Sequence, residues 1–260
     1  MTSSAPTLAV LRAFGVDGRR PERLAGGRGL TWRAGDVVLR PHDGAAVTDW
    51  RAGVLIGLEH TAAFRTPRPV PARDGGWRAG HWEAWEWLPG RADEGRVVDV
   101  IRAGRAFHEA VAHLARPAFL DHTDDAWSRA DRMAWEEAPL ARGQSLDRLS
   151  RAFRRVRSPS QLVHGDLLGN VLFADGQPPA VIDWPPYWRP VGLGTAIAAV
   201  DAVCWHGVPL DRLDVLGDGV AEWTQLLVRA LAFRIATLQL VGGWDAAGED
   251  RHRPVVDALV

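Results

Sequence analysis

The sequence predicts an α+β protein with two lobes, a small β-rich lobe followed by a larger, mainly helical one. Two observations support this. Short apolar runs separated by Gly-rich or Pro-rich turns dominate the first third of the chain, which is typical of strands and hairpins. Apolar residues at helical spacing dominate the remainder. A chain of 260 residues is long enough for one large domain or two modest ones.

The first lobe is expected to span residues 1–88, with a disordered terminus at 1–6. Its strands are expected at 30–34, 37–39 and 81–88, with a turn at Gly35-Asp36 between the first two. Helical spacing predicts one helix over 48–58, with Thr48 or Asp49 as its N-cap. The last strand stops at Pro89-Gly90, which predicts the lobe boundary.

The second lobe is expected to span residues 89–260. Helices are predicted at 97–114, from Trp127, at 146–156, at 193–205 and at 220–241. Residues 161–183 interrupt them with short strands that present a loop, 164–170. Residues 242–260 carry too few periodic apolar side chains to predict an element.

The composition excludes several classes of protein. Hydrophobic residues make up 47% and charged residues 24% of the chain, as in globular proteins. A formal net charge of -1 provides no positive field that would bind nucleic-acid phosphates. No apolar run approaches a membrane span and residues 1–12 lack a signal-peptide pattern, so we expect a cytoplasmic protein without a membrane partner. The single Cys204 excludes an internal disulfide.

Three polar residues around the predicted strands suggest phosphoryl transfer. Asp166 is placed to accept the proton of an attacking hydroxyl, while Asn170 and Asp183 offer oxygen ligands to Mg²⁺. A strand hairpin separates Asn170 from Asp183 and returns both to one edge. Phosphoryl transfer needs this combination, because its catalysis consists mainly of positioning and charge stabilisation.

The surrounding residues carry a resemblance to a known family. His164-Gly165-Asp166, residues 170–173 and Val181-Ile182-Asp183 resemble the catalytic and metal-binding motifs of the aminoglycoside phosphotransferase and choline kinase superfamily. The resemblance implies a bilobal protein-kinase-like fold, with a catalytic loop at 162–173 and a metal-binding segment at 180–190. It also implies transfer of the γ-phosphate of ATP, with Mg²⁺, to a hydroxyl of a small molecule.

The same resemblance assigns cofactor-binding residues in the first lobe. Residues 24–34 would be the Gly-rich loop over the nucleotide, and residues 38–40 the strand that carries a phosphate-contacting cation. Residues 86–88 would be the hinge beside the adenine. The implied binding residues are Gly26, Gly27, Gly29, Arg40, Glu86 and Leu88. Without the downstream motif, the three glycines would indicate only a hairpin.

The chain departs from the superfamily's pattern in three places. Asn170 follows Asp166 by four positions where five are usual, so the loop must close more tightly. Arg40 stands where the family has lysine, which keeps the charge but changes its geometry. Gly53 stands where a helix Glu usually pairs with that lysine, which leaves Asp49 or Glu59 as substitutes. These departures support an alternative function, a nucleotide-binding pseudokinase that acts as a regulator or scaffold.

Several other polar and aromatic residues have competing interpretations. His164 is expected to brace the loop by hydrogen bonding and not to take part in chemistry. Asp201 is expected to tie its helix to the catalytic loop or to Arg189, because a buried carboxylate needs a partner. Two charged runs are interpreted mainly as solvated surfaces: the acids Asp121, Asp124, Asp125, Asp131, Glu136 and Glu137, and the arginines Arg151, Arg154, Arg155 and Arg157. Three aromatic residues either line an acceptor pocket or pack inside the lobe: Trp184, Tyr187 and Trp188.

Overall fold

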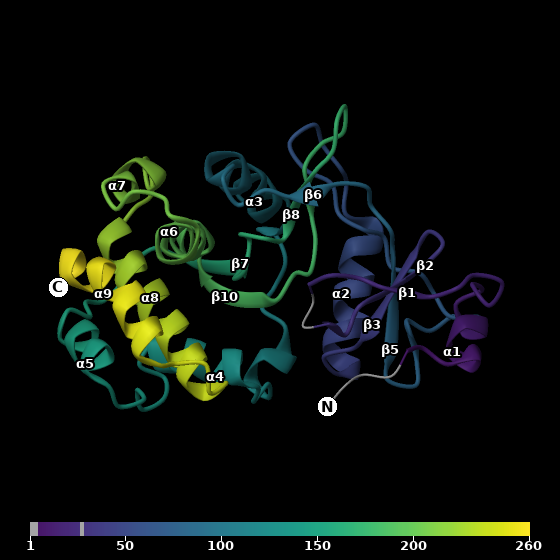
Figure 1. Cartoon of the computed structure of the whole chain (residues 1–260), viewed down its shortest axis with the longest axis horizontal. Coiled ribbons are helices and arrows are strands. Elements are labelled where there is room, and N and C mark those ends of the chain that lie inside the picture. Colours follow the sequence, from purple (N-terminus) through teal and green to yellow (C-terminus); the bar gives the residue numbers. More distant parts are fainter. Residues whose placement is uncertain (1–4, 27–28) are drawn as a thin grey trace. The chain divides into compact units, whose positions relative to one another are not determined.

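The computed structural model describes residues 5–26 and 29–260. It has the predicted α+β composition, and the chain divides into two compact units (Figure 1). Unit 1 contains residues 1–90 and 174–182, and unit 2 contains residues 91–173 and 183–260. Residues 174–182, which the sequence predicts in the second lobe, group with unit 1. Arg65 accounts for this, since its N–H donates to Pro179 O at 2.8 Å and its carbonyl accepts from Val181 N at 2.8 Å.

Unit 1 is built on a five-stranded sheet in the order β1-β2-β3-β5-β4, with every neighbouring pair antiparallel. The strands are β1 (Glu22–Arg23), β2 (Trp32–Ala34), β3 (Val37–Pro41), β4 (Arg78–Ala79) and β5 (Trp82–Glu86). The helices are α1 (Leu8–Ala13) and α2 (Ala45–Gly57), and β9 (Ala180–Val181) also belongs to this unit. The β2–β3 turn at Gly35 confirms the predicted hairpin.

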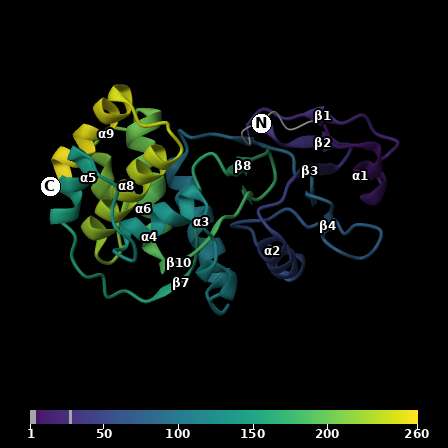
Figure 2. The ribbon, with the colours of Figure 1, turned by 90° about the horizontal axis from the view of Figure 1, so that it is seen from below.

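The pleat of β3 and β5 separates apolar from charged residues. Leu39 is paired with Ala84, and both belong to a core that contains residues of α1. The next pair, Arg40 with Glu83, points to the other side, where Glu83 contacts side chains of α2. Figures 1 and 2 show α1 and α2 on opposite faces of this sheet. The alternation therefore gives the sheet one apolar face and one face with a buried charged cluster.

The start of α2 differs from the prediction. The helix begins at Ala45, after Gly44 with φ 123°, and neither Thr48 nor Asp49 caps it. Thr48 lies in the first helical turn, and its hydroxyl donates to Glu83 Oε2 at 2.8 Å. The need of a buried carboxylate for donors thus outweighs the local capping preference of threonine.

Unit 2 is mainly helical. Its helices are α3 (Val97–Val111), the 3₁₀ helix η2 (Ala118–Asp121), α4 (Ala126–Ala134), α5 (Gln144–Arg151), α6 (Gly192–His206), α7 (Arg212–Leu216), α8 (Trp223–Leu240) and α9 (Ala246–Leu259). Its strands form two antiparallel pairs, β6 (Arg91–Ala92) with β8 (Val171–Phe173), and β7 (Ser160–His164) with β10 (Pro186–Pro190). Helices α6 and α8 are buried on nearly all sides and pack against each other (Figure 1).

Two helix boundaries in unit 2 correct the sequence-based expectation. Helix α5 ends at Arg151 and not at 156, because side chains near the start of α8 take the following N–H groups. Gln225 accepts from Arg154 N at 2.6 Å, and Glu222 accepts from Arg157 N at 2.8 Å. Residues 246–259, which show no clear periodicity, form α9 with Asp245 as its N-cap.

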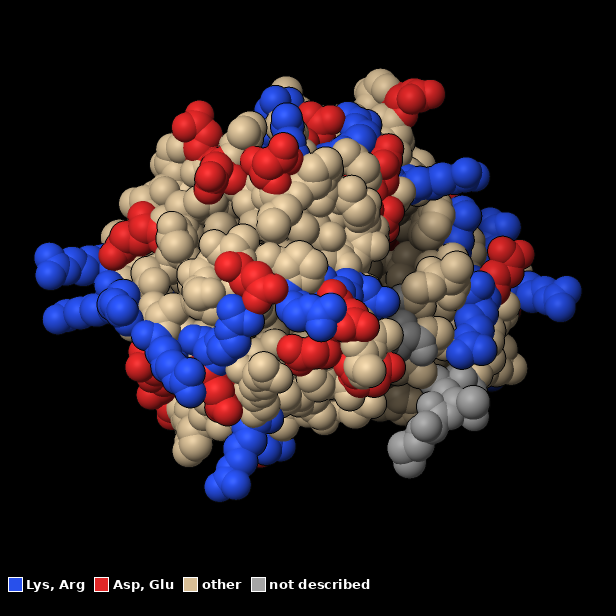
Figure 3. All heavy atoms as spheres, turned by 60° about the vertical axis from the view of Figure 1, so that its left-hand side comes forward, with Lys and Arg blue, Asp and Glu red and all other residues tan. Residues whose placement is uncertain are grey.

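The charged side chains on the surface are of mixed sign. On the face drawn in Figure 3, Arg side chains are interspersed with Asp and Glu side chains, in agreement with the formal net charge of -1. Among residues 5–26 and 29–260, no helix has both the length and the apolar composition needed to cross a bilayer.

Candidate active site

The loop between β7 and β8 carries Asp166 and is braced by two histidines. The His164 N–H donates to His108 Nε2 at 2.8 Å, and His164 Nδ1 accepts from Asp166 N at 3.1 Å. Both histidines are fully buried. Burial, with a contribution from His164, lowers the pKa of His108 to about 3, so its ring is neutral and can accept this hydrogen bond. The predicted bracing role of His164 is confirmed.

The four-residue spacing from Asp166 to Asn170 is accommodated by a tight turn. Asn170 N donates to Leu167 O at 2.9 Å, and Gly169 has φ 85°, which favours glycine. The side-chain amide of Asn170 donates to Asp166 O at 2.8 Å and to Asp166 Oδ2 at 3.2 Å. Because the amide nitrogen is used in this way, the Asn170 carbonyl oxygen can serve a cation.

The other oxygen of Asp166 is held by a residue that sequence reasoning missed. Arg234 Nη2 on α8 donates to Asp166 Oδ1 at 2.6 Å, and Arg234 Nε donates to Asp201 Oδ1 on α6 at 2.8 Å. Burial raises the pKa of Asp201, and the Arg234 guanidinium opposes that shift. Asp201 therefore reaches the catalytic loop through Arg234, one of the two predicted possibilities.

Arg189, the other predicted partner of Asp201, belongs to a separate cluster. Its guanidinium donates to Asp131 at 2.6, 3.0 and 3.1 Å and to Glu137 at 2.5 and 2.8 Å. Asp131 is buried, so the interpretation of the whole acidic run as a solvated surface is wrong for this residue. Asp125 also has a specific structural role as the N-cap of α4, accepting from Trp127 N at 2.9 Å.

Asp183, the second predicted metal ligand, follows β9 in the chain and is exposed. Its φ is 50°, in the left-handed region, which Asp tolerates better than most residues. Non-glycine residues in this region concentrate at functional sites. Asn170 and Asp183 offer an amide and a carboxylate oxygen, which fit a hard cation that takes its other ligands from water and phosphate. The described part of the chain contains no group of three His, Cys, Asp or Glu side chains arranged for a metal ion.

The aromatic residues after Asp183 mainly pack against the catalytic loop. Trp184 is 2% exposed, stacks edge-on against Phe107 at 4.9 Å, and donates from Nε1 to Val163 O at 3.2 Å. Tyr187 lies so close to Gly165 that a Cβ there would be 2.4 Å from the ring. Both residues thus have the packing role that was one of the two predicted alternatives.

In unit 1, the acid partner of Arg40 is Glu83 on the neighbouring strand, and not Asp49 or Glu59. Arg40 Nε donates to Glu83 Oε1 at 2.6 Å, and Arg51 Nη2 on α2 donates to the same carboxylate at 2.8 and 3.1 Å. Burial opposes the charge of Glu83, but the two arginines, together with hydrogen bonds from Trp85 and Thr48, outweigh it and lower the pKa of Glu83. The acid partner therefore lies on a strand, and not on the helix or after it as expected from the sequence.

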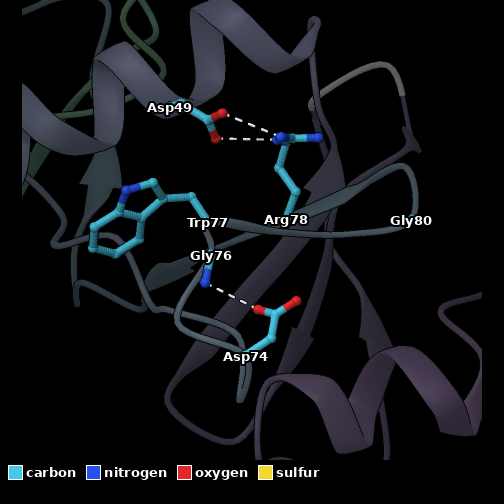
Figure 4. A pocket seen from close by; sticks show the side chains of 6 residues that line it. All are labelled: Asp49, Asp74, Gly76, Trp77, Arg78 and Gly80. Carbon is cyan, nitrogen blue, oxygen red and sulfur yellow. Dashed lines mark hydrogen bonds and ion pairs between the residues drawn. The ribbon is translucent and has the colours of Figure 1, made fainter.

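Asp49 instead forms a bidentate pair with Arg78, at 3.0 and 3.1 Å, beside a pocket in unit 1. Figure 4 shows this pair on the pocket wall, with Asp74 accepting from Gly76 N on another part of it. None of the predicted site residues lines this pocket, whose lining is Asp49, Asp74, Gly76, Trp77, Arg78 and Gly80.

The remaining predicted nucleotide contacts also lie in unit 1. Gly26 and Gly29 have φ 93° and 68°, and Gly29 N donates to Gly26 O at 2.8 Å. Gly27 lies outside the described residues. Glu86 is exposed and accepts from Arg68 N at 3.2 Å, while Leu88 is buried. A tight glycine turn is compatible with both a plain hairpin and a phosphate-binding loop, so the nucleotide role stays a prediction.

The comparison with known families identifies the family of this chain. The pattern of the phosphotransferase enzyme family (APH) matches residues 29–187, more than half of the chain. This chain belongs to the phosphotransferase enzyme family. The predicted superfamily is thereby confirmed.

Solved structures confirm the fold of this chain. An aminoglycoside phosphotransferase from Alicyclobacillus acidocaldarius is 19% identical, with 99% of this chain and 94% of that chain covered and a TM-score of 0.54. A thermostable mutant of the aminoglycoside phosphotransferase APH(4)-Ia, in complex with AMP-PNP and hygromycin B, is 16% identical, with 92% and 94% covered and a TM-score of 0.59. A choline/ethanolamine kinase family protein from Mesorhizobium loti is 17% identical, with 92% and 87% covered and a TM-score of 0.55. No curated protein matches the sequence significantly.

The phosphotransferase family motif located Asp166 and Asn170, which the structure brings into hydrogen-bond contact. It did not reveal Arg234 or Glu83. Both are charged residues within apolar segments, and such a residue needs a buried partner. A charged residue within an apolar segment was the feature that identified Asp201, and it could have identified Arg234 and Glu83 in the same way.

Proposed function

We propose that this protein transfers the γ-phosphate of ATP to a hydroxyl of a small molecule. The observation that carries the proposal is the arrangement of Asp166, whose two carboxylate oxygens are held by different donors, Asn170 and Arg234. The side chain of Asp166 is nevertheless 45% exposed, so an acceptor can reach it. A carboxylate that is oriented yet accessible is what hydroxyl activation requires.

In the proposed reaction, the acceptor oxygen attacks the γ-phosphorus and Asp166 takes the hydroxyl proton. The bond between the γ-phosphorus and the bridging oxygen breaks, and ADP leaves with the bonding electrons. Arg40 would contribute positive charge to the nucleotide phosphates, with Glu83 holding its Nε at 2.6 Å. Asn170 and Asp183 would hold Mg²⁺, which neutralises phosphate charge when bound.

The comparison structures support the reactant classes of this proposal. The APH(4)-Ia mutant was solved with AMP-PNP and hygromycin B, a nucleotide and a small molecule. We accordingly propose a small molecule with a hydroxyl group as the acceptor.

Thermal unfolding with ATP alone, Mg²⁺ alone and both together tests the nucleotide and metal sites. A ligand at 100 times its Kd adds about 2.7 kcal/mol to the free energy of unfolding, so Tm should rise by several degrees only with the pair. Asp183→Asn should abolish this shift. Asp175→Asn, at an exposed hairpin position, is the matched control and should keep it. No shift for the wild type under any condition would contradict the proposed nucleotide site.

A nucleotide-binding pseudokinase is the second candidate, and the replacement of lysine by Arg40 favours it. The Arg40 guanidinium is planar and already committed to Glu83 at Nε, so its grip on phosphate differs from that of an ammonium group. ADP formation with panels of hydroxyl compounds separates the two functions. Turnover that falls to a low residual rate in Asp166→Ala supports the enzyme, whereas a Tm shift with ATP and Mg²⁺ but no turnover on any panel supports the pseudokinase.

A further inference from the structure

Arg234 joins the catalytic loop to the core of unit 2. Its side chain is 13% exposed and that of Asp201 is 10% exposed, so both charges are largely withdrawn from water. Asp201 accepts from Arg234 Nε at 2.8 Å and from Nη2 as well. The two residues come from α8 and α6, which pack against each other (Figure 1). The guanidinium is therefore held in place by Asp201 through both Nε and Nη2.

The contact from Arg234 to Asp166 is not needed to neutralise a buried charge. Asp201 already supplies one negative charge for the one positive charge of Arg234. Asp166 is 45% exposed, and an ion pair with such a partly solvated carboxylate contributes little to stability. The hydrogen bond from Arg234 to Asp166 instead affects the orientation of the Asp166 carboxylate. Asp166 is the carboxylate of the catalytic loop that the proposed reaction uses.

The two donors to Asp166 restrict the rotation of its carboxylate. Arg234 Nη2 approaches Oδ1 at 2.6 Å, and Asn170 Nδ2 approaches Oδ2 at 3.2 Å. With one donor on each oxygen, rotation about the bond to the carboxylate would break both hydrogen bonds. Proton acceptance from an attacking hydroxyl depends on such a fixed orientation.

We propose that Arg234, anchored by Asp201, is a positioning residue that fixes the Asp166 carboxylate for the acceptor hydroxyl. This inference rests on the proposed function, in which Asp166 takes the hydroxyl proton. Arg234 itself contacts neither reactant in this scheme and acts through Asp166.

Kinetics in two backgrounds tests the proposal. Arg234→Met should lower kcat by about 10- to 100-fold, the effect of a small misplacement of a reacting group, with the KM for ATP within about twofold of wild type. In an Asp166→Ala background the same substitution should cause no further loss, because residues that act as a unit are non-additive. An equal loss in both backgrounds would overturn the proposal and make Arg234 a structural residue.

Arg229 provides the matched control. It lies on the same helix, α8, and only 3% of its side chain is exposed, but it donates to Ala134 O and to Glu136 Oε2, both outside the catalytic loop. Arg229→Met should leave kcat within about threefold of wild type. If it lowers kcat as much as Arg234→Met, loss of a buried arginine in general, and not positioning, explains the effect.

Two further variants keep the test valid if Arg234→Met folds poorly by leaving Asp201 unpaired. Arg234→Met with Asp201→Asn removes both charges and should show the same loss of kcat. Arg234→Lys retains the charge without the planar fork and should recover part of the loss. Full activity of the double variant would overturn the proposal.

A crystal structure of the double variant gives a readout that does not depend on turnover. We expect the loop backbone to be retained and the Asp166 carboxylate to adopt more than one orientation. A single, wild-type orientation would overturn the inference. If the wild type shows no turnover but the variant disorders Asp166, the proposed function fails. Arg234 would then still fix the orientation of the Asp166 carboxylate.

Discussion

Replacing Glu83 by Gln keeps the size of this side chain and removes the charge that two arginines share. The carboxylate accepts from Arg40 Nε at 2.6 Å, from Arg51 Nη2 at 2.8 and 3.1 Å, from Thr48 Oγ1 at 2.8 Å and from Trp85 Nε1 at 3.0 Å. A glutamine has one accepting oxygen. The N–H groups of its amide would point at the N–H and O–H groups that now donate to Glu83. The substitution therefore removes most of the negative charge that compensates this buried positive charge.

The burial of these groups sets the size of the effect. Glu83 is 1% exposed and Arg51 is 2% exposed, so water cannot replace the lost charge there. Arg51 retains its ion pair with Asp43 at 3.2 Å, and Arg40 is 17% exposed to water. Both facts reduce the expected loss in the free energy of unfolding. Breaking a buried pair costs about 3–5 kcal/mol, and we expect the lower end, about 3 kcal/mol. At about 2–4 °C per kcal/mol this corresponds to a fall in Tm of about 6–12 °C.

Urea and thermal unfolding of Glu83→Gln and Asp49→Asn, measured side by side, check this value. Asp49 is the acid that the sequence offers as a partner of Arg40, but it is about half exposed and pairs with Arg78. An exposed pair contributes about 0.2–1 kcal/mol, so Asp49→Asn should be nearly neutral. If Asp49→Asn costs as much as Glu83→Gln, or Glu83→Gln costs less than 1 kcal/mol, the assignment of Glu83 as the partner is refuted.

The pH dependence has a definite sign. The pKa of Glu83 is lower in the folded than in the unfolded chain, so its contribution is present at neutral pH and is lost as pH falls through the folded value, below 4.5. The stability difference between wild type and Glu83→Gln should therefore shrink as pH falls through that range. A difference that stays constant down to pH 3 would contradict the charge-based explanation.

Three further predictions concern the catalytic loop. Gly165→Ala places a Cβ 2.4 Å from the Tyr187 ring and should cost about 1–3 kcal/mol in urea unfolding, and an unchanged midpoint would contradict the packing. Gly169→Ala should lower the free energy of unfolding by about 1 kcal/mol, because φ is 85° at this position. Gly53→Ala is the control: a Cβ there would meet no atom within the helix surroundings, so the change should be neutral or stabilising. His108 has a folded pKa of about 3, so its contribution to stability is present above pH 6.5 and is lost as pH falls towards 3, by about 1.4 kcal/mol per pH unit. His108→Gln should flatten this slope in unfolding measured across pH, and an unchanged slope would show that His108 is not the titrating group.

The sequence predicted the elements whose information is local. The β2–β3 hairpin follows from a Gly turn between short strands, and α3, α6 and α8 follow from helical periodicity. Helix α9 was not predicted, because it buries only four residues, Gly248, His252, Val255 and Val256. Its start depends on the Asp245 cap, and its formation on packing against α5, α6 and α8.

The sequence by itself also determined the family and the loop that carries Asp166 and Asn170, since these residues lie four positions apart within one motif. Only the tertiary structure decided which charges meet. Arg40 pairs with a residue 43 positions away, Arg189 with Asp131 at 58, and Arg234 with Asp166 at 68. A sequence shows that a charge in an apolar segment needs a partner, because burying it alone is costly. The identity of the partner depends on strand register and helix packing, which bring distant segments within hydrogen-bond distance only in the folded chain.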